Sequence, residues 1–310
     1  MKIYKPAFWD YKKPNFLAYL LKPFTFPILL REHFKKNKVK VKNIKTICVG
    51  NIYLGGTGKT PTTIMLNEIF KNLNYKTCFI KKFYTNQKDE QLLLKKYGTL
   101  FCEKERITAI KKALKNKINI AILDDGLQDK SIDYDLKFVC FNTQKWVGNG
   151  FIIPAGPMRE SLDSLKNYHG IFLNGNGENT NSIKRIIKKK YKNIKIFESK
   201  YTIENIYKIE KNQKYLVFSG IGNPTIFNDT LKKNKIKVIK NINFPDHHNY
   251  SNTEISKIKK EAAKLGAKIL TTEKDFLRLN FKNRKNIYYA KAKLSIINKK
   301  KLINFLKINL

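Results

Sequence analysis

Three glycines, a lysine and a threonine stand close together between an apolar segment, Ile47–Val49, and an amphipathic one that begins after Pro61. A strand, a glycine-rich loop and a helix in this order can bind phosphate, because the loop and the helix start direct backbone N–H groups at phosphate oxygens. Lys59 would neutralise the β- and γ-phosphates of a nucleotide, and the Thr60 hydroxyl would bind magnesium. The residues expected to hold ATP are Leu54, Gly55, Gly56, Thr57, Gly58, Lys59, Thr60 and Pro61.

One position departs from the consensus phosphate loop. The pattern G-x-x-x-x-G-K-[ST] has a glycine where this chain has Tyr53. An ordinary glycine turn before a helix is therefore the alternative to a phosphate-binding loop.

Two carboxylates, Asp124 and Asp125, end an apolar strand expected at 118–124. Ligands bind at the carboxyl ends of the strands in a parallel sheet, so either carboxylate could hold Mg²⁺ beside Thr60. Neighbouring strand residues point to opposite faces, so the two need not share one role. The alternative is a solvated acidic turn.

Arg159 and Glu160 offer a cation and an anion where a loop is expected to enter a helix. An arginine can bind a transferring phosphoryl group through two parallel hydrogen bonds. Glu160 is a further candidate ligand for magnesium, although it could simply cap the helix. A surface ion pair is the alternative for Arg159.

His247 and His248 lie in the segment 244–250, which holds half of the four histidines in the chain. Histidine suits proton transfer near neutral pH, and we single out His247 for that role. Zinc binding is disfavoured, because no second cluster with ligand spacing accompanies the pair. A purely structural loop remains open from the local sequence.

The 310 residues carry a formal charge of 63 − 24 = +39, which would attract nucleic acid, anionic membranes or phosphorylated substrates. Lysine, asparagine and isoleucine are abundant throughout, so biased composition explains the charge equally well. Four cysteines have the spacing of neither a zinc site nor a redox pair, which favours free thiols in a reducing cytosol. These cysteines are Cys48, Cys78, Cys102 and Cys140.

Residues 1–36 alternate aromatic and aliphatic side chains with lysines, and Pro14, Pro23 and Pro27 divide them into short pieces. This pattern is typical of a segment that lies in a membrane interface, and the alternative is a helix packed on the protein's own core. No apolar run has the length of a spanning helix, and the N-terminus does not resemble a signal peptide.

The rest of the chain alternates strand and helix signals, which predicts an α/β fold with a mostly parallel sheet flanked by helices. We expect a membrane-associating segment at 1–36, a phosphate-loop domain at 37–205, a smaller α/β domain at 206–297 and a C-terminal helix at 298–310 of uncertain packing. In the first domain, strands are expected at 46–51, 77–81, 118–124, 136–142 and 171–174, and helices at 58–73, 88–97, 105–116 and 182–191. In the second, strands are expected at 215–220, 237–241, 268–271 and 286–290, and helices at 224–233 and 253–265.

Taken in order, the motifs resemble the tetraacyldisaccharide 4′-kinase family of lipid A biosynthesis. The resemblance spans residues 45 to 280, and the family's phosphate loop also lacks the first consensus glycine. The matching segments are 49–61, 89–90, 124–128, 148–150, 154–160, 244–248 and 272–275.

The resemblance implies a kinase with ATP and Mg²⁺ that phosphorylates the 4′-hydroxyl of a tetraacyl glucosamine disaccharide 1-phosphate. It also implies a phosphate-loop domain and a smaller domain joined by a two-stranded linker, at the cytoplasmic face of the inner membrane. Asp89 matches the acid of a dyad that acts with His247 as base, Asp124 and Asp125 match the magnesium-side carboxylates, and Arg159 matches an arginine that contacts phosphate. We expect a monomer that does not bind nucleic acid.

One motif departs from the family, which commonly has S-R-G-Y-G where this chain has Lys81-Lys82-Phe83-Tyr84-Thr85. Lys82 keeps a positive charge there but lacks the planar fork of arginine. The alternative function is a basic phosphate-loop ATPase that acts on nucleic acid, and a third class is a membrane scaffold without activity.

Overall fold

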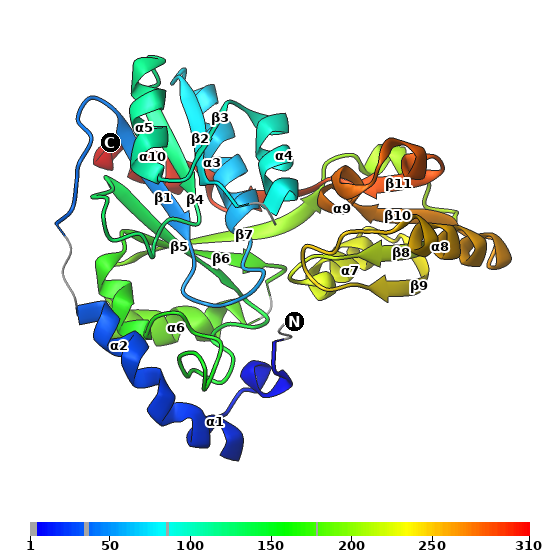
Figure 1. Cartoon of the computed structure of the whole chain (residues 1–310), viewed down its shortest axis with the longest axis horizontal. Coiled ribbons are helices and arrows are strands. Elements are labelled where there is room, and N and C mark those ends of the chain that lie inside the picture. The colour runs from blue at the N-terminus through cyan, green and yellow to red at the C-terminus, as the bar shows by residue number, and fades with distance from the viewer. Residues whose placement is uncertain (1–4, 34–36, 85–86, 178) are drawn as a thin grey trace.

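The computed structural model describes residues 5–33, 37–84, 87–177 and 179–310, and it describes no side chains at 31–33. The ends of the expected membrane segment, 1–4 and 34–36, and Thr85 of the altered motif lie outside these residues. Two sheets organise the chain into a large lobe and a small lobe, which Figure 1 shows side by side.

The large lobe is built on an eight-stranded sheet in which only the edge strand β12 is antiparallel to its neighbour. The strand order is β12-β7-β6-β5-β1-β4-β2-β3. Buried aliphatic and aromatic residues dominate the central strands, as expected for parallel strands covered on both faces. The strands are β1 (Lys45–Gly50), β2 (Thr77–Lys82), β3 (Leu100–Glu103), β4 (Ile120–Asp124), β5 (Leu136–Asn142), β6 (Gly170–Gly175), β7 (Lys195–Ile203) and β12 (Ala292–Ile296).

Helices cover both faces of this sheet. On one face, α3 (Lys59–Asn72), α4 (Lys88–Tyr97) and α10 (Lys299–Asn309) bury aliphatic side chains against the strands. On the other face, α5 (Arg106–Lys115) and α6 (Thr180–Lys190) do the same. The expected α/β fold, with a mostly parallel sheet between helices, is confirmed.

The small lobe has a parallel four-stranded sheet in the order β11-β10-β8-β9. Its helix α7 packs with one cluster of buried residues and its helix α8 with a second cluster. The elements are β8 (Lys214–Ser219), α7 (Pro224–Lys233), β9 (Lys237–Asn243), α8 (Asn252–Lys264), β10 (Lys268–Thr272), α9 (Glu273–Arg278) and β11 (Ile287–Ala290).

The structure corrects the expected domain limits at one end. Residues 292–296 fall inside the expected smaller domain, 206–297, but they form strand β12, which pairs with β7 in the large sheet, where Ala292 lies opposite Ile203. The chain thus leaves the large lobe along β7 and returns along β12, an extended two-stranded connection. Sequence reasoning also missed the four-residue strand β3 and the six-residue helix α9, because both are too short to show a period.

The N-terminal segment has one part that packs on the protein's own core and another part with exposed apolar side chains. The side chain of Trp9 is buried and its indole N–H donates to the Pro154 carbonyl at 3.0 Å, so this part packs on the large lobe. The short helices α1 (Phe16–Leu21) and α2 (Phe26–His33) follow, and Phe16 is 80% exposed. Among the described residues, no helix is long and apolar enough to cross a bilayer.

The C-terminal helix α10 packs on the large sheet, which decides a question that the sequence left open. Leu302 and Leu306 are buried in the cluster that contains Phe138 and Phe197. The ring of Phe305 lies 5.4 Å from that of Phe197.

We expect Leu302→Ala to lower the free energy of unfolding by about 2–5 kcal/mol, because it leaves a cavity between α10 and the sheet. Chemical denaturation measures the change, and Lys301→Ala on the exposed side of the same helix is the control. Equal stabilities for the two variants would contradict this packing.

Candidate active site

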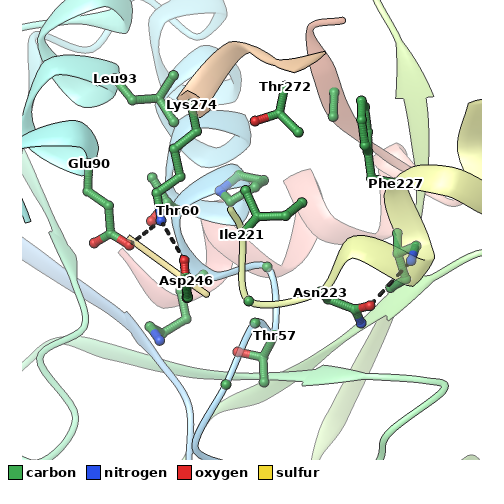
Figure 2. A pocket seen from close by; sticks show the side chains of 18 of the residues that line it. Thr57, Thr60, Glu90, Leu93, Ile221, Asn223, Phe227, Asp246, Thr272 and Lys274 are labelled. Atoms are coloured by element: carbon green, nitrogen blue, oxygen red, sulfur yellow. Dashed lines mark hydrogen bonds and ion pairs between the residues drawn. The ribbon is translucent and has the colours of Figure 1, made fainter. Parts of the chain in front are cut away.

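A cavity of about 430 Å³ lies between the two lobes. The phosphate loop and α4 contribute its large-lobe side, and the loop after β8 and the start of α9 contribute its small-lobe side. Figure 2 shows Glu90, Asp246 and Lys274 on one side of this pocket, with Leu93 beside them, and Phe227 on the other side.

The glycine-rich loop runs from the end of β1 into α3 in a shape fixed by buried polar side chains. Asn51 donates to the Thr57 hydroxyl at 3.0 Å, and Asn174 donates to the Thr57 carbonyl at 2.9 Å. Gly58 has a φ of 80°, which favours glycine, and an added Cβ would lie 2.6 Å from the Tyr201 hydroxyl. All eight residues expected to hold the nucleotide, 54–61, line the pocket.

Tyr53 occupies the place of the missing consensus glycine and has a structural role. Its side chain is buried and its hydroxyl donates to Asp10 in the N-terminal segment. Burial raises the pKa of Tyr53, and the neighbouring Asp10 carboxylate raises it further, so this phenol stays protonated. The tyrosine therefore ties the phosphate loop to the N-terminal segment.

Lys59 and Arg159 share one carboxylate. Asp125 Oδ2 lies 3.6 Å from Lys59 Nζ, and Asp125 Oδ1 lies 3.2 Å from Arg159 Nη1. The backbone N–H of Arg159 donates to the Ile52 carbonyl at 2.7 Å, which holds the arginine beside the phosphate loop. Burial opposes ionisation of Asp125, but the two cations hold its pKa below the usual value. Both cations line the pocket and could bind a phosphate group together.

Thr60 lines the pocket, and Asp124 lies directly behind it without lining the pocket. The Thr60 hydroxyl donates to Asp124 Oδ2 at 3.1 Å, and Asp124 is fully buried. A hydroxyl and a carboxylate are the hard oxygen donors that Mg²⁺ prefers, and phosphates and waters usually complete its shell. The described residues hold no group of three or more His, Cys, Asp or Glu able to bind a metal.

Glu160 does not join this group. Its carboxylate accepts hydrogen bonds from Gln128 at 3.0 Å and from the Tyr168 hydroxyl at 2.6 Å. The residues that line the pocket include Arg159 but not Glu160. These contacts place the Glu160 side chain in the packing behind the arginine, and its role as a metal ligand stays a prediction.

Asp89 and His247 meet across the two lobes. His247 Nδ1 lies 3.1 Å from both carboxylate oxygens of Asp89, which is buried at the first turn of α4. His247 lines the pocket, and its Nε2 lies 3.7 Å from Glu90 Oε1. The departure of the segment before Asp89 from the family motif does not prevent this contact.

The neighbouring His248 has a different environment. Its ring stacks on Phe244 with 4.6 Å between ring centres, and its Nε2 lies 3.1 Å from Glu254 Oε1. His248 does not line the pocket. Of the two histidines, only His247 is placed to act on a bound molecule.

Two cations of α9 hold Asp89, and sequence reasoning gave neither of them a role. Arg278 donates to Asp89 Oδ2 from Nη2 at 2.6 Å and from Nε at 3.1 Å, and Lys274 Nζ lies 3.2 Å from the same oxygen. Burial alone would raise the pKa of Asp89, but the hydrogen bond with His247 and these two cations hold it well below the usual value. Lys274 lies in the segment 272–275, which resembles the family but received no function from the sequence. Arg278 lies outside that segment.

The lobes also touch through two glycines. A Cβ on Gly222 would lie 2.8 Å from the backbone nitrogen of Gly56, and a Cβ on Gly56 would lie 2.9 Å from the Gly222 carbonyl carbon. Only glycine at both positions allows the small lobe to approach the phosphate loop this closely.

Comparison with known proteins shows the family. A profile described as Tetraacyldisaccharide-1-P 4′-kinase matches residues 20–310. A Pelagibacter ubique protein named tetraacyldisaccharide 4′-kinase is 50% identical over 311 residues, which cover 100% of this chain and 99% of the relative. A Rickettsia typhi protein of the same name is 31% identical and covers 96% of each chain.

A solved structure supports the fold. The crystal structure of the "apo" form of LpxK from Aquifex aeolicus in complex with ATP aligns with a TM-score of 0.70 and 21% identity, covering 94% of this chain and 99% of that one. This identity is low enough that the likeness shows the fold alone. The family assignment depends on the sequence matches: the chain belongs to the tetraacyldisaccharide-1-phosphate 4′-kinase family and is a kinase.

Proposed function

We propose that this protein transfers the γ-phosphate of ATP to the 4′-hydroxyl of a tetraacyl glucosamine disaccharide 1-phosphate, a step of lipid A biosynthesis. The observation that carries the proposal is that the phosphate loop and His247 line one cavity, and that His247 contacts Asp89 behind it. Cations for the phosphate and a base for the acceptor hydroxyl thus border the same space. The family relationship argues against the alternative of an ATPase that acts on nucleic acid.

The phosphate side of the reaction depends mainly on charge and position. The backbone N–H groups at the start of α3 would hold the phosphate oxygens, and Lys59 and Arg159 would bind the γ-phosphate as its charge spreads. Thr60 and Asp124 would hold Mg²⁺ with the phosphates, and Asp125 would assist from the same edge of the sheet. The metal, when bound, supplies positive charge between the β- and γ-phosphates.

The acceptor side needs a base. Asp89 would accept a hydrogen bond from Nδ1–H of a neutral His247, and Nε2 would then be free to accept a proton. As the 4′-hydroxyl attacks phosphorus, its proton would pass to Nε2, and Asp89 would stabilise the imidazolium that forms. Arg278 fixes the orientation of Asp89 throughout.

The N-terminal helices would place the site at the membrane. Exposed aromatic and aliphatic side chains on α1 and the turn after it include Phe16, Leu20 and Phe24, which are 59–80% exposed. Ile28 and Leu29 of α2 pack on the same core cluster as Ile183 and Ile187 of α6, a helix that carries exposed basic side chains. Apolar insertion beside basic residues suits an anionic surface, such as the cytoplasmic face of the inner membrane. We propose a peripheral monomer.

We expect Lys59→Ala to reduce turnover by about 10²–10³ while the fold is retained, because it removes charge stabilisation at the transferring phosphate. The assay follows transfer from labelled ATP to purified tetraacyl disaccharide 1-phosphate in detergent micelles. Lys45→Ala, an exposed lysine at the start of β1, is the control. No product from folded wild-type protein would refute the proposed function, and near-normal turnover by Lys59→Ala would refute the role of the loop.

We expect Asp89→Asn and His247→Ala each to slow turnover by about 10²–10⁴, as for the loss of a general base. The double variant should be scarcely slower than the worse single variant, because the two groups act as one unit. ATP affinity should stay close to wild type. His248→Ala is the matched control, and losses that multiply, or a greater loss in the control, would contradict the dyad.

We expect the triple change Phe16→Ser, Leu20→Ser and Phe24→Ser to weaken co-sedimentation with anionic liposomes by at least about tenfold, because each burial of a large apolar side chain contributes about 1.5–3 kcal/mol. ATP binding should not change. A matched control replaces Tyr207, Phe281 and Ile308, exposed apolar residues elsewhere, with serine. Equal liposome binding by the two triple variants would exclude the N-terminal surface as the membrane contact.

A further inference from the structure

A lysine lies among the carboxylates of the expected metal site. Lys81, near the end of β2, is 2% exposed. Its Nζ donates to Asp124 Oδ2 at 2.8 Å and to Glu90 Oε2 at 2.6 Å. Because β2 and β4 are neighbouring parallel strands, with Ile80 opposite Leu123, the register brings Lys81 beside Asp124.

This lysine belongs to the motif in which the chain departs from its family. Where the resembling proteins commonly have the serine of S-R-G-Y-G, this chain has Lys81. Lys81 places a buried positive charge at the edge of the sheet where the phosphate loop and Asp124 lie.

The lysine is held as a cation. Burial opposes its charge, and the two carboxylates that contact its ammonium, Glu90 at 2.6 Å and Asp124 at 2.8 Å, offset that cost. Burial likewise opposes ionisation of Glu90, yet Lys274 and Lys81 lower the pKa of this carboxyl. A buried charge without a partner is strongly unfavourable, so the three side chains depend on one another.

The position of the ammonium matters because of the oxygen that it contacts. Asp124 Oδ2 accepts from both Lys81 Nζ and the Thr60 hydroxyl, and Thr60 and Asp124 are the donors suited to Mg²⁺. A divalent cation that used this oxygen would lie close to the ammonium and be repelled by it. The same ammonium keeps the carboxylates oriented when no metal is bound.

We propose that Lys81 is a positioning residue, the resident counter-ion of Asp124 and Glu90. It orients both carboxylates before the substrate binds and lowers the affinity of the site for a free divalent cation, so that the metal enters together with the triphosphate. The proposal rests on the proposed function only in taking Mg-ATP as the substrate form. Its test uses neither nucleotide nor lipid.

The test measures divalent-cation binding to the full chain without nucleotide. Mn²⁺ serves as the probe, and electron paramagnetic resonance measures the free ion during titration. Lys81→Met and Lys81→Ser should bind Mn²⁺ at least about tenfold more tightly than wild type, because they remove a positive charge beside two carboxylates. Lys112→Met removes an equal charge from an exposed pair with Glu103 and should bind Mn²⁺ like wild type.

Thermal unfolding provides a second measurement. Without divalent cations, Lys81→Met should melt at a lower temperature than wild type, because two carboxylates lose their counter-ion. Added Mn²⁺ should raise the melting temperature of Lys81→Met more than that of wild type or Lys112→Met, because a ligand that binds the folded state stabilises it. A merely structural lysine would give the lower melting temperature without this response to Mn²⁺.

If the single Lys81 variants do not fold, the same change can be tested in a protein that also carries Glu90→Gln. In Glu90→Gln, Asp124 keeps its ion pair with Lys81. In Lys81→Met/Glu90→Gln, Asp124 keeps only its hydrogen bonds from two threonine hydroxyls. Removing Lys81 in this background should again tighten Mn²⁺ binding by about tenfold or more. Unchanged Mn²⁺ affinity on removal of Lys81, in whichever background folds, would overturn the proposal.

Discussion

Carboxylates shielded from water need cations, and this requirement links the parts of the structure. Asp124 is fully buried and Asp89 is 5% exposed, and a buried charge without a partner is strongly unfavourable. Lys81 from β2 forms an ion pair with Asp124, and Arg278 from α9 forms an ion pair with Asp89. One pair holds the edge of the large sheet together and the other joins the two lobes.

Nucleotide binding then becomes an exchange of partners. In this structure Asp125 holds Lys59 and Arg159, the two cations that the proposed reaction assigns to the γ-phosphate. A phosphate group would compete with Asp125 for them, while a metal arriving with the phosphate would supply the positive charge that the carboxylates lose. Preorganised cations of this kind need little rearrangement as charge develops in the transition state.

The sequence predicted the elements and the separate motifs well, but it predicted their pairings less well. The phosphate loop and the strand ending at Asp124 were evident because strand, loop and helix follow one another locally. The contact of Asp89 with His247 joins residues 158 positions apart, and it came only from resemblance to a family. Lys274 and Lys81 were assigned no function because lysine is common throughout this chain, and Arg278 because no local motif marks it. Only burial beside carboxylates distinguishes these three side chains from solvated surface cations.

The same limits apply to the division into lobes. No composition change marks the return of the chain at β12, since pairing with β7 depends on distant residues. This two-stranded connection leaves the small lobe attached at one side, while α9 and the Gly56–Gly222 contact join it to the large lobe at the pocket. Asp89 comes from one lobe and His247 from the other, so the proposed base forms only when the lobes meet. A base completed by both lobes would limit the reaction of ATP with water before the acceptor hydroxyl is enclosed.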